Sequence, residues 1–363
     1  MTSAEKGHAA TVASSEFTIT TPSESADNTQ DAVSAKGISN RRRIMRRGLN
    51  SSPAYMFGVL AALFLVFSIL SPDTFPTEAN VKNLVVDTSI FLVMSVGMTY
   101  VMVAAGFDLS IGSVLVFSGI CAVKTMTWIG GDGYWTAAAG LVVAILAGIV
   151  WGLFNGFCVT RLRVPALITT LGSLGAALGI ANLMTNGNDI AVAQHALINI
   201  QIDQVFGLPW IVWLSVVVVL IGGAVLRFTR FGRHTYVIGS NDEAARRAGI
   251  NVNSHLVKLY AISGGLAGLA GMMSLVRFST TTIGGHSQDA LTVITGVILG
   301  GTSLYGGYGV ILGTVIGIFI PTVLQNGLVV QGVQPFWQNV AIGFILIAAV
   351  YLDQLKRRGR DRA

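Results

Sequence analysis

The sequence predicts an all-α integral membrane protein with about ten transmembrane helices. Three observations support this: the composition, the lengths of the apolar runs and the placement of positive charge. Hydrophobic residues make up 52% of the 363 residues and charged residues only 11%, and the mean hydropathy is +0.67. A soluble domain carries about a quarter charged residues, so this chain has too few charges to cover a surface in water. The 43 glycines also suit a membrane bundle, because small residues let helices approach closely.

A transmembrane helix needs about 20 apolar residues, and the chain contains ten candidate spans of roughly that length. The junctions near Gly106 and Gly301 could each be a broken or re-entrant segment, which is permitted only where protein or a water-filled cavity covers the backbone. The predicted spans are 55–71, 81–105, 109–127, 136–159, 166–185, 208–227, 256–276, 290–304, 310–327 and 337–352.

Positive residues gather in four clusters that flank the predicted spans. With ten spans all four fall on one side of the membrane, which the positive-inside rule makes cytoplasmic, so both termini are predicted to be cytoplasmic. The opposite loops are poor in positive charge, since 186–207 has none and 277–289 has only Arg277. The clusters are Arg41, Arg42, Arg43, Arg46 and Arg47; Arg161 and Arg163; Arg227, Arg230, Arg233, Arg246 and Arg247; and Lys356, Arg357, Arg358, Arg360 and Arg362.

The chain divides into three predicted regions. Residues 1–48 form a polar N-terminal segment rich in Ser, Thr and Ala, which is expected to be a disordered cytoplasmic tail because it has too little apolar surface to offset its ordering entropy. Residues 49–356 form the transmembrane domain, which includes a long cytoplasmic loop at 227–255, and residues 357–363 form a short cytoplasmic tail.

The two halves of the transmembrane domain resemble each other at an offset of about 171 residues. An offset that spans five helices inverts the second copy, which predicts the inverted repeat common in transporters, with the substrate near the midplane between the repeats. The four landmark pairs are Ile111-Gly112 with Ile283-Gly284, Gly130-Gly131 with Gly300-Gly301, Asn155-Gly156 with Asn326-Gly327, and Pro165 with Pro335.

The loop at 227–255 contains the signals of a short helix. Ser240 or Asn241 can cap it, acidic residues 242–243 suit its first turn, basic residues 246–247 suit its last turn, and Gly249 suits its end. A helix this short is not stable alone and must pack against something. It is either a docking element for another protein or a surface helix on its own bundle.

The segment Glu243-Ala244-Ala245-x-x-x-Gly249 resembles the coupling-helix motif of ABC importer permeases. Further motifs resemble one branch of these proteins, the ribose/xylose/arabinose-type sugar permeases, and the resemblance covers roughly residues 50–356 with its motifs in order. These motifs are Gly106-Phe107-Asp108-Leu109-Ser110-Ile111-Gly112-Ser113, Asn155-Gly156 with Leu162 to Leu171, Phe231 to Gly239, and Gly300 to Gly307.

The resemblance implies an ABC importer permease fold and the import of a monosaccharide that an external solute-binding protein delivers. It also implies a second permease chain, expected to be an identical copy, and a separate ATPase subunit that carries ATP-Mg, so this chain is expected to bind no cofactor. The expected location is the bacterial inner membrane, in contact with lipid. The residues expected to couple to the ATPase are Gly239, Asn241, Glu243, Ala244, Ala245, Arg246 and Gly249.

One departure from the family pattern leaves the sugar unassigned. Many members carry a Glu-Leu pair where a span begins ahead of the Gly-Gly-Thr-Ser run, whereas this chain has Ala290-Leu291 after Gln288 and Asp289. The change could shift the sugar preference or have no effect. A nucleoside or autoinducer importer of the same branch also stays open.

Asp108 is the most informative single residue, because a charge between two apolar runs is costly and by default functional. It could line the pathway or a hinge beside it, or it could cap a helix by accepting the N–H of Ser110 or Ile111, and these roles are compatible. A sugar pathway needs hydroxyl, amide and aromatic groups, although each such residue can equally be a helix contact. The candidate pathway residues are Phe107, Asp108, Ser110, Thr169, Thr170, Asn182, Thr292 and Thr295.

Several other classes of function lack their sequence signals. None of the six lysines stands between a glycine and a Ser or Thr, so the sequence lacks a Walker A loop. A secondary carrier would fit the repeat equally well, but no membrane-embedded His/Asp/Glu relay is evident. An intramembrane enzyme would need a Ser/His set or paired carboxylates within the spans, and none is found. The histidines lack metal-ligand spacing, and the basic residues flank spans rather than form a nucleic-acid patch.

Overall fold

The computed structural model describes residues 52–192, 194–286 and 288–360. The predicted tail at 1–48 and residues 361–363 lie outside the described residues. The elements in chain order are α2 (Ser52–Leu70), α3 (Glu78–Val103), α4 (Ile111–Ile129), α5 (Tyr134–Thr160), α6 (Ala166–Thr185), α7 (His195–Ile202), β1 (Gln204–Val205), β2 (Leu208–Pro209), α8 (Trp210–Phe228), α9 (Arg230–Ser240), α10 (Asp242–Arg247), α11 (Val252–Phe278), α12 (Asp289–Leu299), α13 (Ile311–Val330) and α14 (Pro335–Arg360).

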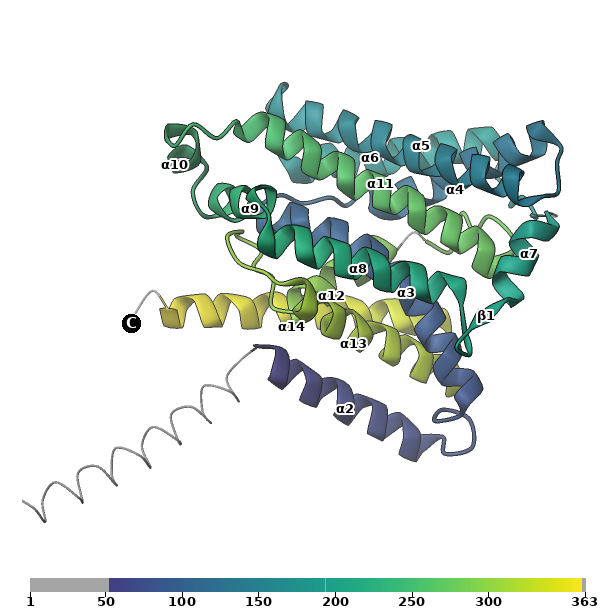
Figure 1. Cartoon of the computed structure of the whole chain (residues 1–363). Coiled ribbons are helices and arrows are strands. Elements are labelled where there is room, and N and C mark those ends of the chain that lie inside the picture. The colour runs from purple at the N-terminus through teal and green to yellow at the C-terminus, as the bar shows by residue number, and fades with distance from the viewer. Residues whose placement is uncertain (1–51, 193, 287, 361–363) are drawn as a thin grey trace, which may run out of the picture. The chain divides into compact units, whose positions relative to one another are not determined.

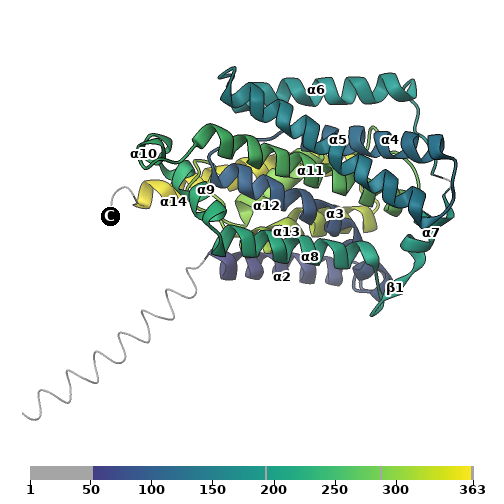
Figure 2. The same cartoon turned by 45° about the horizontal axis from the view of Figure 1, so that its top comes forward.

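The long helices lie side by side, with α9 and α10 at one end of the bundle and α7 and β1 at the other (Figures 1 and 2). Each of the ten predicted spans coincides with one helix, namely α2 to α6, α8 and α11 to α14. Seven of the described helices are long and apolar enough to cross a membrane, and the shorter apolar helices are Tyr55–Leu70, Asp289–Leu299 and Pro335–Tyr351. The all-α membrane fold is therefore confirmed, while ten crossings remain a prediction.

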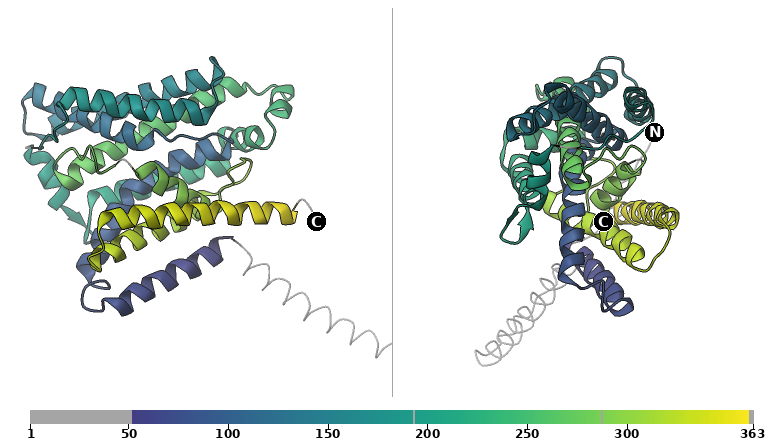
Figure 3. Two further views of the ribbon diagram at one scale, coloured as in Figure 1. Left: turned by 180° about the vertical axis from the view of Figure 1, so that it is seen from behind. Right: turned by 90° about the vertical axis from the view of Figure 1, so that its right-hand side faces the viewer.

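Helices α3 and α11 form the centre of the bundle. The most apolar part of each is 83% buried, whereas the corresponding parts of α5, α6 and α8 are only 22–28% buried and present apolar side chains outward. In the views from behind and along the helices, α2 and α14 lie on the side away from α5 and α6 (Figure 3). An apolar exterior around a buried centre is what a bilayer requires, because lipid tails offer no hydrogen bonds but accept apolar surface.

Glycine lets α5 and α11 pack with their backbones in contact. A Cβ atom added at Gly148 would lie 2.1 Å from the carbonyl oxygen of Gly264, and one added at Gly264 would lie 2.1 Å from the carbonyl oxygen of Gly148. Any larger residue at either position would push the helices apart. This is the small-residue packing that compensates for the weak hydrophobic drive between helices in lipid.

The helix contacts support the predicted repeat. Helix α11 packs against α4 and α5, and α3 packs correspondingly against α12 and α13, while α6 contacts α4 as α14 contacts α12. Helices α3 and α11 run in opposite directions, since the Arg277 Nε near the end of α11 donates to the Asp87 Oδ1 near the start of α3 at 2.7 Å. Three landmark pairs occupy equivalent places, but Ile283-Gly284 precedes α12 whereas Ile111-Gly112 begins α4. The first pair is therefore not equivalent.

Both uncertain junctions are breaks between helices. Residues 104–110 separate α3 from α4, and residues 300–310 separate α12 from α13. In the first break Ala104 is 6% exposed and Ser110 is fully buried, and the Gly106 N–H is satisfied by the Val101 carbonyl at 2.9 Å. Protein thus covers most of this irregular backbone, as membrane depth requires, while Ala105 is exposed. Helix α12, which ends at Leu299, is shorter than the predicted span.

Two connections contain more structure than the sequence predicted. The segment 186–207, predicted only as a loop, contains α7 and the first strand of the antiparallel β1–β2 hairpin. The loop at 227–255 contains α9 as well as the predicted short helix, which is α10. Both additions lie at the ends of the bundle (Figure 1).

Candidate functional site

Helix α10 follows α9 through a single shared residue, Asn241. The Asn241 N–H donates to the Val237 carbonyl at 3.0 Å and so ends α9, while its side-chain Oδ1 accepts the Ala244 N–H at 2.8 Å and so begins α10. Of the two predicted caps, Asn241 is therefore the correct one. Ser240 belongs to α9, and its Oγ donates to the Tyr236 carbonyl at 2.9 Å.

The charges of α10 are arranged as the sequence predicted. Arg247 pairs with Glu243 at 2.5 Å, and Arg246 Nε lies 3.9 Å from the Asp242 carboxylate. Ala245 is fully buried and holds the helix against the bundle, and Gly249 ends it with a φ of +82°. Because residues 241–244 and 246–249 are exposed, α10 presents a short charged surface that a partner can contact.

One predicted coupling residue, Gly239, does not lie on α10. It belongs to the last turn of α9 and faces the bundle, where a Cβ atom would lie 1.8 Å from the Val103 carbonyl oxygen of α3. The predicted coupling residues thus separate into an exposed set on and beside α10, the buried Ala245 that holds α10 against the bundle, and one inward-facing glycine on α9.

A buried polar cluster surrounds Asp108 in the α3–α4 break. Asp108 is 1% exposed. Its Oδ1 accepts the Ser110 N–H at 3.1 Å and the Ser110 hydroxyl at 2.6 Å, and its Oδ2 accepts the Ser263 hydroxyl of α11 at 2.9 Å. The expectation that Asp108 caps a helix is only partly correct, because α4 begins at Ile111 with Ser110 as its first flanking residue. Asp108 instead closes a turn and joins it to α11.

Three residues that the sequence did not single out as site residues complete this cluster. The Asn155 Nδ2 of α5 donates to the Ser110 hydroxyl at 2.8 Å, and the Tyr260 hydroxyl of α11 donates to the Phe107 carbonyl at 3.0 Å. Asn155 appeared in a family motif and could have been noticed, whereas Ser263 and Tyr260 carried no local signal. The cluster fixes the break to α5 and α11 together.

The other predicted pathway residues do not join this cluster. The hydroxyls of Thr170 and Thr295 and the amide of Asn182 bond to carbonyls of their own helices at 2.7–2.9 Å. Thr169 and Thr292 make longer contacts with carbonyls just before their helices, with Val164 at 3.5 Å and with the N-cap residue Gln288 at 3.4 Å. These five residues lie on α6 and α12, so the structure separates them from Asp108 and Ser110 rather than gathering one polar site.

A second buried cluster joins the end of α11, the connection that follows it and the start of α12, and its histidine lies in that connection rather than within a span. His286 Nε2 lies 2.8 Å from the Ser274 Oγ, and His286 Nδ1 lies 2.6 Å from the Asp289 Oδ2. The sequence hid this set because 15 positions separate Ser274 from Asp289. The adjoining cavities hold about 30 and 10 Å³, room for about one water molecule at most. Each of these two cavities is therefore too small to hold a sugar.

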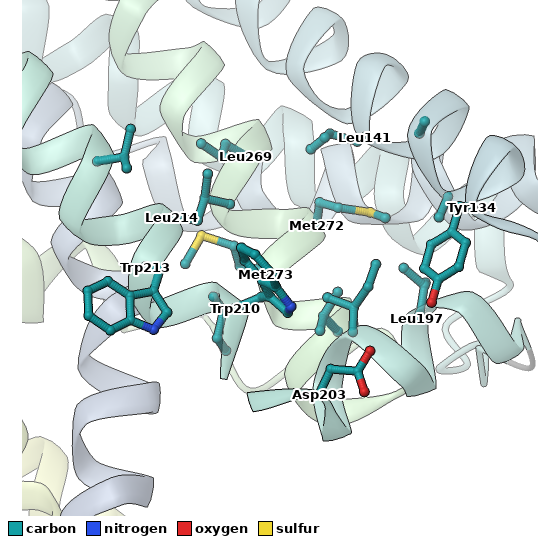
Figure 4. A pocket seen from close by; sticks show the side chains of 16 residues that line it. Tyr134, Leu141, Leu197, Asp203, Trp210, Trp213, Leu214, Leu269, Met272 and Met273 are labelled. Carbon is teal, nitrogen blue, oxygen red and sulfur yellow. The ribbon is translucent and has the colours of Figure 1, made fainter. Parts of the chain in front are cut away.

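An apolar groove of about 670 Å³ opens between α5, α7, α8 and α11 near the α7 end. Figure 4 shows Trp210, Trp213, Tyr134 and the two methionines of α11 around it, with Asp203 at one side. Because the remaining lining is almost entirely aliphatic, sugar hydroxyls would find few hydrogen-bond partners there. The groove is suited to apolar groups.

Comparison with known proteins identifies the family. Residues 80–350 match the family described as the branched-chain amino acid transport system / permease component. The chain belongs to this permease family. The matched range contains α10 and both buried polar clusters.

The permease also resembles characterised sugar transporters over most of its length. It is 34% identical over 330 residues to the ribose import permease protein RbsC of Escherichia coli (strain K12), covering 90% of this chain and 100% of that protein. It is 34% identical over 314 residues to the L-arabinose transport system permease protein AraH of the same strain, covering 84% of this chain and 91% of that one. It is 33% identical over 299 residues to the D-allose transport system permease protein AlsC of the same strain, covering 82% of this chain and 90% of that one. No solved structure matches the chain.

Proposed function

We propose that the permease is the membrane subunit of an ATP-driven ABC importer that takes up a monosaccharide delivered by a solute-binding protein. Relatives named for ribose, L-arabinose and D-allose support the substrate class. The observation that carries the proposal is α10, a capped helix of six residues whose charged side chains are exposed. It lies beside α9 at one end of the bundle (Figure 1). A helix this short contributes little to its own stability, so a docking role accounts for its exposure.

The proposed assembly contains four kinds of component. Two permease chains, expected to be identical, form the pathway at their interface, and an ATPase subunit binds α10 and carries ATP-Mg. A binding protein docks at the α7 end, which is then the outer face, and both termini are cytoplasmic in the bacterial inner membrane. Lipid surrounds the apolar exterior.

Transport in this assembly is alternating access. ATP binding and hydrolysis move the ATPase subunits, and α10 follows them because Glu243, Ala244 and Arg246 contact them directly. The inverted repeat supplies two related sets of helices that can rock against each other around a central site. In the breaks at residues 104–110 and 300–310, the backbone is not held by helical hydrogen bonds and can adjust.

The test replaces Glu243 by Ala and compares it with Glu78→Ala at the other end of the bundle. The two glutamates are a matched pair, since each forms an exposed i,i+4 ion pair, Glu243 with Arg247 and Glu78 with Lys82. Glu243→Ala is expected to lower both ATPase co-purification and sugar uptake by about tenfold, which corresponds to about 1.4 kcal/mol of lost association. Glu78→Ala is expected to leave both unchanged. Intact association and uptake in the Glu243→Ala permease would refute the coupling role.

A secondary carrier is the second candidate, because inverted repeats also occur in ion-coupled transporters. Uptake measured in vesicles with ATP held constant separates the two candidates. The ABC importer keeps its uptake when an ionophore dissipates the ion gradients, whereas a carrier loses it.

A further inference from the structure

Three segments that are distant in the sequence meet beside α10. They are the last turn of α9, the end of α3, and the loop between α12 and α13, and we define their meeting point as the α9 junction: Tyr236, Gly239, Ser240, Val103 and residues 306–309. The central hydrogen bond runs from the Gly307 N–H to the Val103 carbonyl at 2.8 Å. This bond joins a segment of the second repeat to the end of α3.

The backbone of α9 contacts both of these segments directly. A Cβ atom at Gly239 would lie 1.8 Å from the Val103 carbonyl oxygen and 2.6 Å from the Gly307 nitrogen, so no side chain fits there. The loop also packs closely against α9 and the end of α3, because a Cβ atom at Gly306 would lie 2.7 Å from the Ala105 backbone nitrogen and 2.8 Å from the Gly239 carbonyl oxygen. Gly306 and Gly307 have φ values of +79° and +73°, which non-glycine residues adopt only with strain.

One side chain fastens the junction. The Tyr236 hydroxyl of α9 donates to the Gly309 carbonyl of the loop at 2.5 Å. Burial, and to a lesser extent the neighbouring Tyr308, raises the pKa of Tyr236. The hydroxyl therefore stays protonated and able to donate throughout the physiological pH range.

The junction lies between the exposed helix and the buried Asp108 cluster. On one side, Asn241 alone links α9 to α10, with its N–H bonded within α9 and its Oδ1 bonded within α10, and the two helices also pack against each other. On the other side, the chain passes from Val103 into the break that contains Asp108. A displacement of α10 would therefore reach α3 and the loop before α13 through α9, which contacts both of them.

We propose that the α9 junction is the element through which movement of α10 reaches the membrane-spanning helices, with Tyr236 and Gly239 as positioning residues. This inference rests on the proposed ABC function. Helix α9 and the loop at 306–309 move as one body, so opening their contact uncouples ATP hydrolysis from transport. Coupling of this kind requires contiguous packed contacts that both sites can bias, and the junction supplies them.

The first experiment uses Tyr236→Phe, which removes one hydroxyl, and Tyr55→Phe, at an exposed position of α2, as a control. The complete complex is reconstituted in vesicles with its ATPase subunit and loaded binding protein, and sugar transported per ATP hydrolysed is measured. Tyr236→Phe is expected to keep ATPase association and hydrolysis within twofold while lowering the transport ratio at least threefold, and Tyr55→Phe is expected to match the parent. Gly239→Ala is expected to lower the ratio further.

The outcomes separate this inference from the proposed function. If the parent permease does not bind an ATPase subunit, the proposed function fails. If the parent binds it and Tyr236→Phe keeps the parental transport ratio, the junction does not transmit movement. Loss of ATPase association in Tyr236→Phe would also overturn the inference, because the junction would then serve attachment. Should Gly239→Ala fail to fold, Tyr236→Phe decides alone.

A cross-link tests the claim that α9 and the loop move together. The Ser240 Cβ lies 3.3 Å from the position of a Cβ at Gly307, close to the separation that a disulfide spans. Cysteines at both positions, with Cys121 and Cys158 replaced by Ala, are expected to give the same transport ratio when oxidised as when reduced. Loss of transport on oxidation that a reductant reverses would show that the two segments must slide, and would overturn the proposal.

Discussion

The α3–α4 break and the α11–α12 break occupy equivalent positions in the two repeats, yet they are held in different ways. The first, residues 104–110, is fastened by the Asp108 carboxylate, which accepts three hydrogen bonds. Among the described residues, no basic side chain forms an ion pair with it. The second, residues 279–288, is fastened by His286, which bridges Ser274 and Asp289. The first break thus depends on the Asp108 carboxylate, which accepts hydrogen bonds, and the second on the His286 ring, which can both donate and accept them.

Both hydrogen-bonded clusters include a serine of α11. Ser263 and Ser274 are both on α11, and about 16 Å of helix separates them at 1.5 Å per residue. The first cluster also reaches α5 through Asn155, whereas at the second a Cβ atom added at Gly112 of α4 would lie 2.7 Å from the His286 carbonyl oxygen. Helix α11 is therefore the common anchor of the two breaks, while the Asp108 cluster also joins α5 and the His286 cluster also joins α12.

The largest expected effect is that of Asp108→Ala. It leaves Ser110 and Ser263 without their buried acceptor, and each unsatisfied buried group costs about 1–3 kcal/mol, so we expect the free energy of unfolding to fall by about 3 kcal/mol and transport to fall more than expression. Thermal unfolding in detergent and uptake in vesicles measure the two quantities. Asp108→Asn, which keeps the shape and one acceptor, is the control and is expected to lose less. An equal loss of expression and transport would limit Asp108 to a structural role.

A smaller effect is expected for His286→Ala. Removing the ring leaves the Ser274 hydroxyl and the Asp289 carboxylate without their shared partner, and we expect a loss of about 2 kcal/mol of unfolding free energy. Ser274→Ala removes one end of the bridge and is expected to cost about 1 kcal/mol. Thermal unfolding of the two variants and of Asp108→Ala under one set of conditions tests the ranking. A greater loss in His286→Ala than in Asp108→Ala would reverse the comparison.

The smallest effect is expected at an exposed pair on the α7 side, Asp132 and His195. The His195 N–H donates to the Asp132 Oδ1 at 2.7 Å, and this bond, followed by the contact with the histidine ring, lowers the pKa of Asp132. A lowered carboxyl pKa contributes stability that is present above the unfolded-state pKa and is lost as the pH falls through the folded-state value. The melting temperature of the parent should therefore exceed that of Asp132→Asn at neutral pH, and the difference should vanish in acid. A difference that grows as the pH falls would contradict this.

The sequence was sufficient to predict those features that depend on residues close together in the chain. Helix α10 was predicted with its acidic first turn, its basic last turn and its Gly249 end, because caps and i,i+4 pairs involve residues only a few positions apart. The sequence could not decide whether Ser240 or Asn241 caps α10, because the answer depends on α9 extending to Ser240. Helix α9 itself was missed because a short polar helix is stabilised mainly by packing, here against α3 and α8.

The candidate pathway shows the opposite case. Thr169, Thr170, Asn182, Thr292 and Thr295 have suitable chemistry for a sugar, but the fold assigns their donors to carbonyls four or five residues earlier, within or just before their own helices. Ser263 and His286 looked unremarkable in the sequence and became central because the fold places them against Asp108 and Ser274. Residue type alone does not say which partner a polar side chain meets.

The sequence by itself determined that this is a helical membrane protein with related halves and a short charged helix in its longest polar loop. Composition, run length and residue order suffice for these features, because solvent preference and helix capping act locally. Only the tertiary structure decided that α3 and α11 are central, that Gly239 faces Val103, and that Ser274, His286 and Asp289 form one chain of hydrogen bonds. These depend on contacts between segments far apart in the chain, which no local pattern encodes.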